Sequence, residues 1–205
     1  MAFDTDNLPE ILDHLWRHLE AATRSAKPPF HLPTLCSVDA EGRPAARTVV
    51  LRRVDRDRRR LICHTDIRAE KFDQFSERPD AAWVFYDAPA RIQLRATGPM
   101  TLHTDDALAD EQWERSGLGS RRCYLAPVAP GSLADGPSPN LPEAVLEERI
   151  TEAQSLPGRA NFAVLSCSVD RFDWLYLHHA GHRRAEFRWP SVSNGQAAAA
   201  SWLEP

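Results

Sequence analysis

The strongest constraint on the fold is the order of apolar segments from residue 34 onward, where strand-like patterns follow one another with few helices between them. The segments 34–39 and 46–55 flank the turn DAEGRP, which predicts a β-hairpin. Further strands are expected at 60–66, 81–87 and 89–103, the last with a bulge or turn at Gly98, and in two C-terminal stretches, FAVLSCSVDRFDWLYLHHA and HRRAEFRW. Strands and helices do not alternate, so this order predicts a mainly β (α+β) fold: an antiparallel barrel of six to seven strands with peripheral helices.

Helical patterns lie around these strands. The segment 8–25 places its apolar residues on one helical stripe, with Asn7 or Asp6 as a cap and Pro9 in the first turn. Shorter helices are expected at 68–77, at 104–116 with Thr104 or Asp105 as the cap, and at 141–155.

The chain has the length of a single domain spanning residues 1–205. Its expected parts are an N-terminal helical region (1–30), an irregular surface loop rich in proline and glycine (126–142), and C-terminal strands (160–205).

Composition excludes several classes of protein. The 25 Lys and Arg residues against 29 Asp and Glu give a net charge of -4, which argues against a generally basic nucleic-acid binder. The sequence contains no apolar run near the ~18 residues of a membrane helix, and its acidic N-terminus does not resemble a signal peptide. We therefore expect a cytoplasmic protein with no nucleic-acid or membrane partner.

The cysteines and histidines predict neither a disulfide framework nor a metal site. Three cysteines, Cys36, Cys63 and Cys167, lie within apolar stretches, which is typical of buried and unreactive thiols. The group His178, His179 and His182 has no neighbouring carboxylate or thiol that would complete a metal site. The segment GLGSRR lacks the third glycine of a dinucleotide fingerprint and follows no strand, which indicates a loop.

One group of residues has the chemistry of a phosphate site. Arg47 begins an apolar strand that ends in Arg52, while Thr65 ends the next strand and Lys71 lies on the following helix. If these residues converge, two cations, a hydroxyl group and a helix start would surround an anion. The alternative is that they are ordinary solvated charges at the ends of strands.

The chain resembles the pyridoxamine 5'-phosphate oxidases and related proteins of the FMN-binding split-barrel fold, over nearly its full length. The resemblance depends on several short motifs found in the family's order. They are RTVVLR (47–52), HTD (64–66) with Lys71, QLRATG (93–98), and a terminal block that contains Trp174, His182, Arg184 and WLEP.

The resemblance implies that FMN is the cofactor, with a deazaflavin as a possible relative in the same cleft. It places Arg47 and Lys71 near the cofactor phosphate, Gln93 at the flavin, and Trp174 and Arg184 across the interface of a homodimer. The cofactor-binding residues that it assigns are Arg47, Thr48, Val49, Val50, Leu51, His64, Thr65, Lys71, Gln93, Trp174 and Arg184.

The substrate side departs from the family pattern. His182 and Arg52 match the catalytic, substrate-facing positions, but Arg52 replaces a lysine and Ala180 replaces an arginine of the oxidases. Glu70 stands where the oxidases carry an arginine beside the phosphate-binding lysine.

The resemblance implies an FMN-dependent oxidoreductase that passes a hydride from a small-molecule substrate to flavin, with dioxygen as the final acceptor. The departures leave the substrate open. Alternatives are a flavin reductase that uses a nicotinamide cofactor and a non-catalytic FMN carrier or sensor. A split barrel that binds no flavin conflicts with the joint presence of the cofactor-binding residues.

Overall fold

The computed structural model of the chain describes residues 5–146, 149–190 and 198–205, which form ten strands and five α-helices. The strands are β1 (Thr34–Val38), β2 (Pro44–Thr48), β3 (Arg53–Asp55), β4 (Arg60–Asp66), β5 (Asp80–Asp87), β6 (Ile92–His103), β7 (Phe162–Ser168), β8 (Arg171–Tyr176), β9 (Arg183–Arg188) and β10 (Ala199–Leu203). The α-helices are α1 (Leu8–Ala22), α2 (Glu70–Glu77), α3 (Ala107–Arg115), α4 (Leu118–Arg121) and α5 (Glu152–Ser155).

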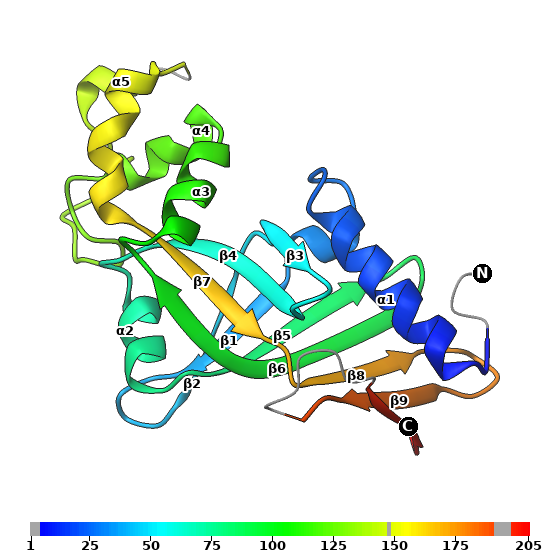
Figure 1. Cartoon of the computed structure of the whole chain (residues 1–205). Helices are drawn as coiled ribbons and strands as arrows, with labels where there is room; N and C mark the ends of the chain where they lie inside the picture. Colours follow the sequence, from blue (N-terminus) through cyan, green and yellow to red (C-terminus); the bar gives the residue numbers. More distant parts are fainter. Residues whose placement is uncertain (1–4, 147–148, 191–197) are drawn as a thin grey trace.

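All strand pairings are antiparallel. The strands β1 to β7 build a barrel, from which a flat arm extends (Figure 1). The strands β2 and β3 follow one another in the chain; β2 pairs with β1 and β3 with β4. The circuit continues from β4 through β7, β6 and β5 back to β1. The strands β8, β9 and β10 extend the sheet beyond β6 as the arm. The predicted antiparallel barrel with peripheral helices is confirmed.

The long strand β6 belongs to both parts of the sheet. Its first half, Ile92 to Thr97, pairs with β8, and its second half, Met100 to His103, pairs with β7. The change of partner occurs at Gly98, where an added Cβ would lie 2.0 Å from the backbone oxygen of Ser168. The strand passes through Gly98 without interruption, so the expected bulge or turn is wrong, and the glycine marks a close backbone approach instead.

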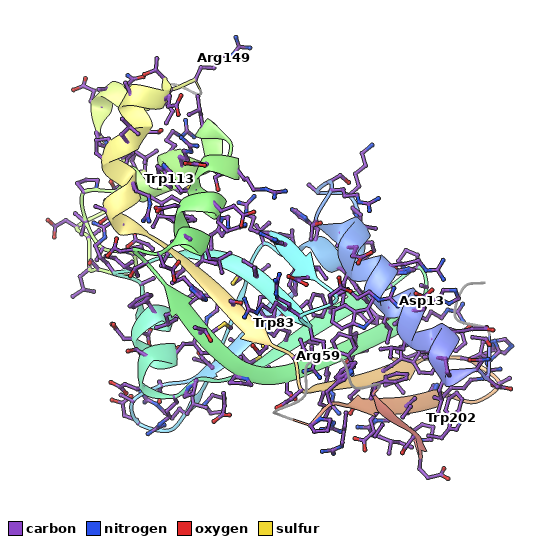
Figure 2. All side chains as sticks on the ribbon, viewed as in Figure 1. Asp13, Arg59, Trp83, Trp113, Arg149 and Trp202 are labelled. Carbon is purple, nitrogen blue, oxygen red and sulfur yellow. The ribbon has the colours of Figure 1, made fainter. Side chains whose placement is uncertain are left out.

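The amphipathic helix predicted at 8–25 is present as α1, and its apolar stripe covers the inner face of the arm (Figure 1). Asn7 caps it by accepting a hydrogen bond from the Glu10 amide. Its Trp16 packs on Phe172 of β8, with ring centroids 4.8 Å apart. The indole of Trp83 on β5 is fully buried inside the sheet (Figure 2). None of the described helices is long and apolar enough to span a bilayer.

The structure has more strands than the six to seven expected, for three reasons. The predicted single strand FAVLSCSVDRFDWLYLHHA divides into β7 and β8. The predicted strand 46–55 leaves its ladder after Thr48, because the amides of Val49 and Leu51 donate to Pro33 and His31 while that of Arg52 donates to Ile62 on β4. The chain therefore divides into β2 and β3. The C-terminal segment adds a further strand, β10, which pairs with β9.

The predicted helix 141–155 is wrong as one continuous element. Residues Glu143–Val145 form a 3-10 turn, and α5 starts separately at Glu152, where Thr151 and Gln154 form a capping box. Residues 147–148 lie outside the described residues. The cap of helix α3 is Asp106, the residue after the expected caps Thr104 and Asp105. The Asp106 carboxylate accepts hydrogen bonds from the amides of Leu108 and Ala109 in the first turn. The loop 126–142 is irregular, as predicted.

Candidate functional site

Arg47, Thr65 and Lys71 come together from three elements, β2, β4 and α2. The Lys71 ammonium donates to the Thr65 hydroxyl at 3.2 Å, and the Arg47 guanidinium donates to the Gln74 side-chain oxygen, one helical turn from Lys71, at 2.8 Å. The guanidinium also donates to the Ser37 hydroxyl on β1 at 2.7 Å. The convergence that the sequence suggested for an anion site is therefore present in the structure.

No carboxylate forms an ion pair with either of these two cations within the described part of the chain, although the charge of Glu70 partly opposes the lowering of both pKa values. The Glu70 carboxylate instead accepts a hydrogen bond from Gln74 at 2.7 Å. Burial lowers the pKa of Lys71, and the nearby positive charge of Arg47 lowers it further. Burial likewise lowers the pKa of Arg47. Two partly buried like charges beside a hydroxyl fit a phosphate group, whose charge would relieve their repulsion.

Ser37 and Gln74 were missed by the sequence analysis, although they hold Arg47 in place. Gln74 lies three residues after Lys71, a helical spacing that puts both side chains on one face of α2. This spacing was the signal in the sequence. No comparable signal marks Ser37, because its position diagonal to Arg47 depends on the pairing of β1 with β2, in which Ser37 lies opposite Ala45 and Arg47 opposite Leu35.

His64 and Thr65 point to opposite faces of β4, as neighbours in a strand do. Thr65 faces Lys71, whereas the His64 ring lies 3.3 Å from the Gln112 side-chain oxygen on α3 and packs edge-on against Phe162. His64 therefore belongs to a second region of the site.

That second region is a cleft of about 620 Å³ between the barrel, α1 and α3. Its cationic lining residues are Arg24, Arg52, Arg53 and Arg115. Glu111 pairs with Arg53 at 2.8 Å and with Arg115 at 3.3 Å, while Arg24 and Arg52 have no ion pair among the described residues. The volume is typical of small-ligand sites, and the surplus of positive charge favours an anionic ligand.

The floor of the cleft is neutral and polar. Burial lowers the pKa of His64 to about 4, the Gln112 hydrogen bond opposes this shift, and the charge of Arg52 adds to it. The Gln112 side-chain nitrogen is buried without a hydrogen-bond partner in the described structure. Gln112 is a further residue that the sequence did not single out.

The lowered pKa of His64 predicts a loss of stability in mild acid. In the folded protein the pKa of His64 is about 4, against 6.5 for an ordinary histidine, so below pH 6.5 the unfolded chain binds a proton at His64 more readily than the folded chain. The free energy of unfolding is therefore highest above pH 6.5 and falls as the pH falls towards 4. We expect about 2 kcal/mol of the free energy of unfolding to be lost from pH 7 to pH 5. Urea titrations of the wild type and His64→Gln at the two pH values measure it. Equal pH dependence in both proteins would contradict the assignment.

Residues 47–52 connect the anion site to the cleft. Arg47 lies at the anion end, Arg52 borders the cleft, and Val49 and Leu51 are buried between them while Thr48 is exposed. An extended segment of this length spans about 16 Å. One elongated ligand along it could therefore reach both regions.

The C-terminal candidate residues do not join this group within one chain. Arg47 on β2 lies opposite Leu35 on β1, which lies opposite Trp83 on β5, which in turn lies opposite Ala96 on β6. Cross-strand partners share a face of the sheet, and the side chains of Leu35, Trp83 and Ala96 on this face form the core. Gln93 is three residues before Ala96 and points to the other face of the sheet. Arg184 shares that outer face, because Leu175 lies opposite both Gln93 and Arg184.

Trp174 and His182 occupy two further environments. The Trp174 side chain is fully buried and stacks on Tyr176, 6.3 Å between centroids. His182 lies in the turn between β8 and β9, where its ring accepts a hydrogen bond from the His178 amide at 3.2 Å. In the described residues, no group of three potential metal ligands comes together, at these histidines or elsewhere.

Of the three cysteines expected to be buried, Cys63 and Cys167 are buried in the structure. Burial raises the pKa of both Cys63 and Cys167 to about 12, which keeps their thiols neutral. Cys36, in the middle of β1, is only partly buried.

Comparisons with known proteins agree with this architecture. Residues 13–104 match the family model described as pyridoxamine 5'-phosphate oxidase, FMN-binding domain. A pyridoxine/pyridoxamine 5'-phosphate oxidase of Cupriavidus necator is 29% identical over 153 residues, which cover 74% of this chain and 67% of the relative.

Two solved structures share the fold. A pyridoxamine 5'-phosphate oxidase-related, FMN binding protein from Nostoc punctiforme gives a TM-score of 0.69 at 24% identity, covering 94% of this chain and 96% of its own. PhzG from Burkholderia lata, solved with tetrahydrophenazine-1-carboxylic acid, gives 0.70 at 17% identity, covering 98% and 95%. Residues 13–104 are thus similar to the FMN-binding domain of the pyridoxamine 5'-phosphate oxidases, and the chain shares the fold of a related FMN-binding protein.

Proposed function

We propose that the protein is an FMN-dependent oxidoreductase that acts on a small anionic substrate. The observation that carries the proposal is the pair of cations, Arg47 and Lys71, which form no ion pair among the described residues and lie at one end of a segment whose other end opens into a cationic cleft. The cofactor phosphate would lie at Arg47, Lys71 and Thr65, and its ring system at the cleft near Leu51 and His64. When bound, FMN supplies an acceptor for a hydride from a substrate carbon and returns the electrons to dioxygen.

The protein would work as a homodimer with the cofactor between two copies. This is supported by the placement of Gln93 and Arg184 on the sheet face opposite to that of Arg47. One copy would bind the cofactor through residues 47–51, Thr65 and Lys71, and the second would contribute Gln93, Arg184 and the region around Trp174 and His182. The C-terminal segment 160–205 would thus complete the site of its partner.

The cleft would bind the substrate through Arg52, with His182 of the second copy facing it. His64 stays neutral at physiological pH because of its lowered pKa, and would act as a hydrogen-bonding group rather than a cation. The named substrates of the curated relatives, pyridoxine and pyridoxamine 5'-phosphate, are the first compounds to test. Ala180 and Arg52 depart from the oxidase pattern, which favours a different preferred anion.

A flavin reductase that uses a nicotinamide cofactor is the second candidate. It is favoured by the four arginines that line the cleft, since a dinucleotide carries a pyrophosphate. Both candidates require bound FMN, and they differ in the electron donor.

The visible absorption spectrum of the purified protein, before and after addition of FMN, is the first test. We expect a protein-bound flavin spectrum and release of FMN on denaturation. Oxygen consumption with pyridoxamine 5'-phosphate, and oxidation of NADH or NADPH, then distinguish oxidase from reductase. Tight FMN binding with neither activity would support a carrier or sensor, and absence of FMN binding would exclude all three.

A prediction for the cleft is that Arg52→Ala weakens substrate use without weakening FMN binding. Loss of one charge-assisted hydrogen bond should lower kcat/KM for an anionic substrate by roughly 10- to 100-fold. Arg56→Ala is the matched control, because Arg56 pairs with Asp13 on α1 and does not line this cleft. Equal kinetics in the two variants would remove Arg52 from the substrate site.

A further inference from the structure

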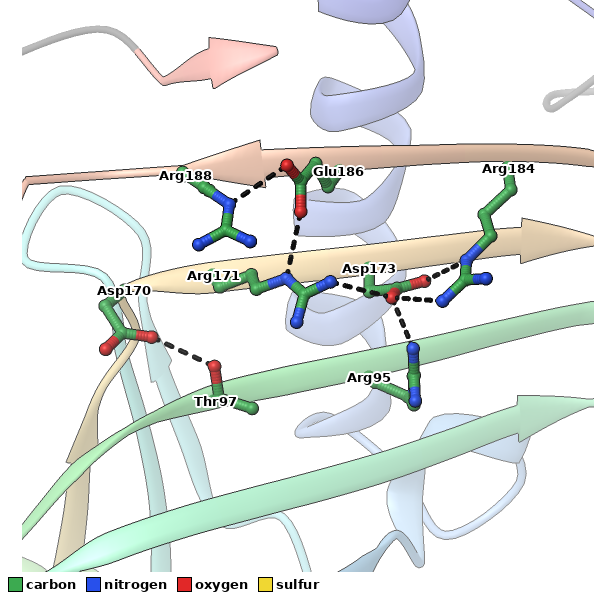
Figure 3. Close-up of polar contacts among 8 residues, drawn as sticks. All are labelled: Arg95, Thr97, Asp170, Arg171, Asp173, Arg184, Glu186 and Arg188. Carbon is green, nitrogen blue, oxygen red and sulfur yellow. Dashed lines mark hydrogen bonds and ion pairs between the residues drawn. The ribbon is translucent and has the colours of Figure 1, made fainter. Parts of the chain in front are cut away.

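A buried carboxylate organises the outer face of the arm (Figure 3). Asp173 on β8 is 3% exposed and accepts hydrogen bonds from Arg95 on β6, Arg171 on β8 and Arg184 on β9. Burial by itself would raise the pKa of Asp173, but the hydrogen bonds of Arg184 and Arg95 outweigh it and the pKa is lowered. The carboxylate is therefore ionised at neutral pH.

The arginine side chains around Asp173 are partly exposed to solvent, whereas the carboxylate is buried. The side chains of Arg95, Arg171 and Arg184 are 43%, 31% and 29% exposed. Glu186 pairs with Arg171 at 3.1 Å and with Arg188 at 3.0 Å, so four arginines surround two acids. The face presented to solvent is cationic. A network that only joined strands would need no such surplus, since like charges on adjacent strands are destabilising.

Asp173 holds Arg184 in a single orientation. The Nε atom of Arg184 donates to Oδ1 at 3.1 Å and its Nη2 atom donates to Oδ2 at 2.9 Å. This two-point contact uses one edge of the planar guanidinium and leaves the edge formed by Nη1 and Nη2 available. A second anion can therefore bind Arg184 in a bidentate manner while Asp173 keeps the side chain in place.

We propose that Asp173 is a positioning residue, which holds Arg184 so that its open edge meets an anionic group brought by a second copy of this chain. The inference rests on the proposed function, in which that anionic group is the FMN bound by the partner. Arg95 and Arg171 share the carboxylate and add positive charge around the contact. Fixing the guanidinium before binding removes the cost of ordering a long side chain in the complex.

The test is the FMN affinity of the apoprotein, measured by quenching of flavin fluorescence. We expect Asp173→Asn and Arg184→Ala each to weaken FMN binding at least tenfold, and the double variant to be no weaker than Arg184→Ala. Asp170→Asn is the matched control: Asp170 accepts from Thr97 at 3.0 Å, and no hydrogen bond or ion pair joins it to Arg95, Arg171 or Arg184 in the described structure. Circular dichroism and chromatographic size verify the fold and the oligomeric state of each variant.

Arg184→Lys provides a test that leaves Asp173 intact. Lysine keeps the charge but cannot form the two-point contact, so it should bind FMN as weakly as Arg184→Ala. Wild-type affinity in Arg184→Lys, or full additivity in the double variant, would overturn the positioning role. Wild-type affinity in Arg184→Ala would overturn both this inference and the assignment of Arg184 to the cofactor. The FMN site at Arg47 and Lys71 has its own separate test.

Discussion

Arg47→Glu should abolish FMN binding. The substitution places a carboxylate beside Lys71, where the proposed phosphate carries a charge of about -1.5 to -2. It also removes the guanidinium that donates to Ser37 and Gln74. Loss of a charge-assisted contact together with the new repulsion should cost more than about 3 kcal/mol, which corresponds to over 100-fold in affinity. Titration of the apoprotein with FMN measures it.

A second variant and a control separate binding from folding. Lys71→Glu reverses the charge at the same site. Among the described residues the Lys71 side chain has a single hydrogen bond, to Thr65, so its replacement should disturb the fold less. His182→Ala lies outside the phosphate contact and should weaken FMN binding several-fold less than either. If Arg47→Glu and Lys71→Glu both fold and bind FMN with wild-type affinity, the phosphate site has been placed wrongly.

Gly98→Ala is expected to be the most destabilising small substitution in the barrel. Gly98 has a φ of +155°, and an added Cβ would lie 2.0 Å from the Ser168 carbonyl oxygen, a backbone atom that cannot rotate away. To make room for the alanine side chain, the variant must separate β6 from the segment that joins β7 to β8. This separation would break the hydrogen bond at 2.9 Å that the Asp170 amide donates to the Thr97 carbonyl oxygen. We expect a loss of about 3 kcal/mol or more, or a fall in Tm of roughly 6–12 °C.

Gly119→Ala is the matched control for this prediction. Gly119 lies in the short helix α4, and an added Cβ would have no atom within 4 Å. Its replacement should leave Tm unchanged or raise it slightly, since alanine favours helix. Thermal unfolding followed by circular dichroism compares the two variants. Similar melting temperatures for both would show that β6 can shift at its change of partner without cost.

The two predictions concern different consequences of one topology. The barrel closes because β6 exchanges β8 for β7 at Gly98. The same exchange leaves β8 and β9 as an arm, whose outer face carries Gln93 and Arg184 away from Arg47. Under the proposed function, a cofactor that contacts both sets of residues would therefore lie between two copies of the chain.

The sequence was most informative where the signal is local. Apolar periodicity predicted α1, α2 and the strands β4 to β6, because burial on one face of a helix or strand repeats with a fixed period. It was least informative at 141–155, where the capping box at Thr151 starts a separate helix within an apparently continuous apolar pattern. Competition between a local cap and a longer helical pattern is decided by packing, which periodicity does not report.

For the candidate site, the sequence by itself determined the chemical groups: two cations and a hydroxyl group near two strand ends, and a cationic residue, Arg52, five positions after Arg47. Only the tertiary structure decided which of the candidate residues lie together and which lie on different faces of the sheet. It turned His64 away from Thr65 into the cleft beside Gln112, and it set Arg184 against Asp173 on the opposite face of the sheet. The reason is physical: residue types and spacing fix charge and periodicity along the chain, whereas the pairing of distant strands decides which side chains share a face.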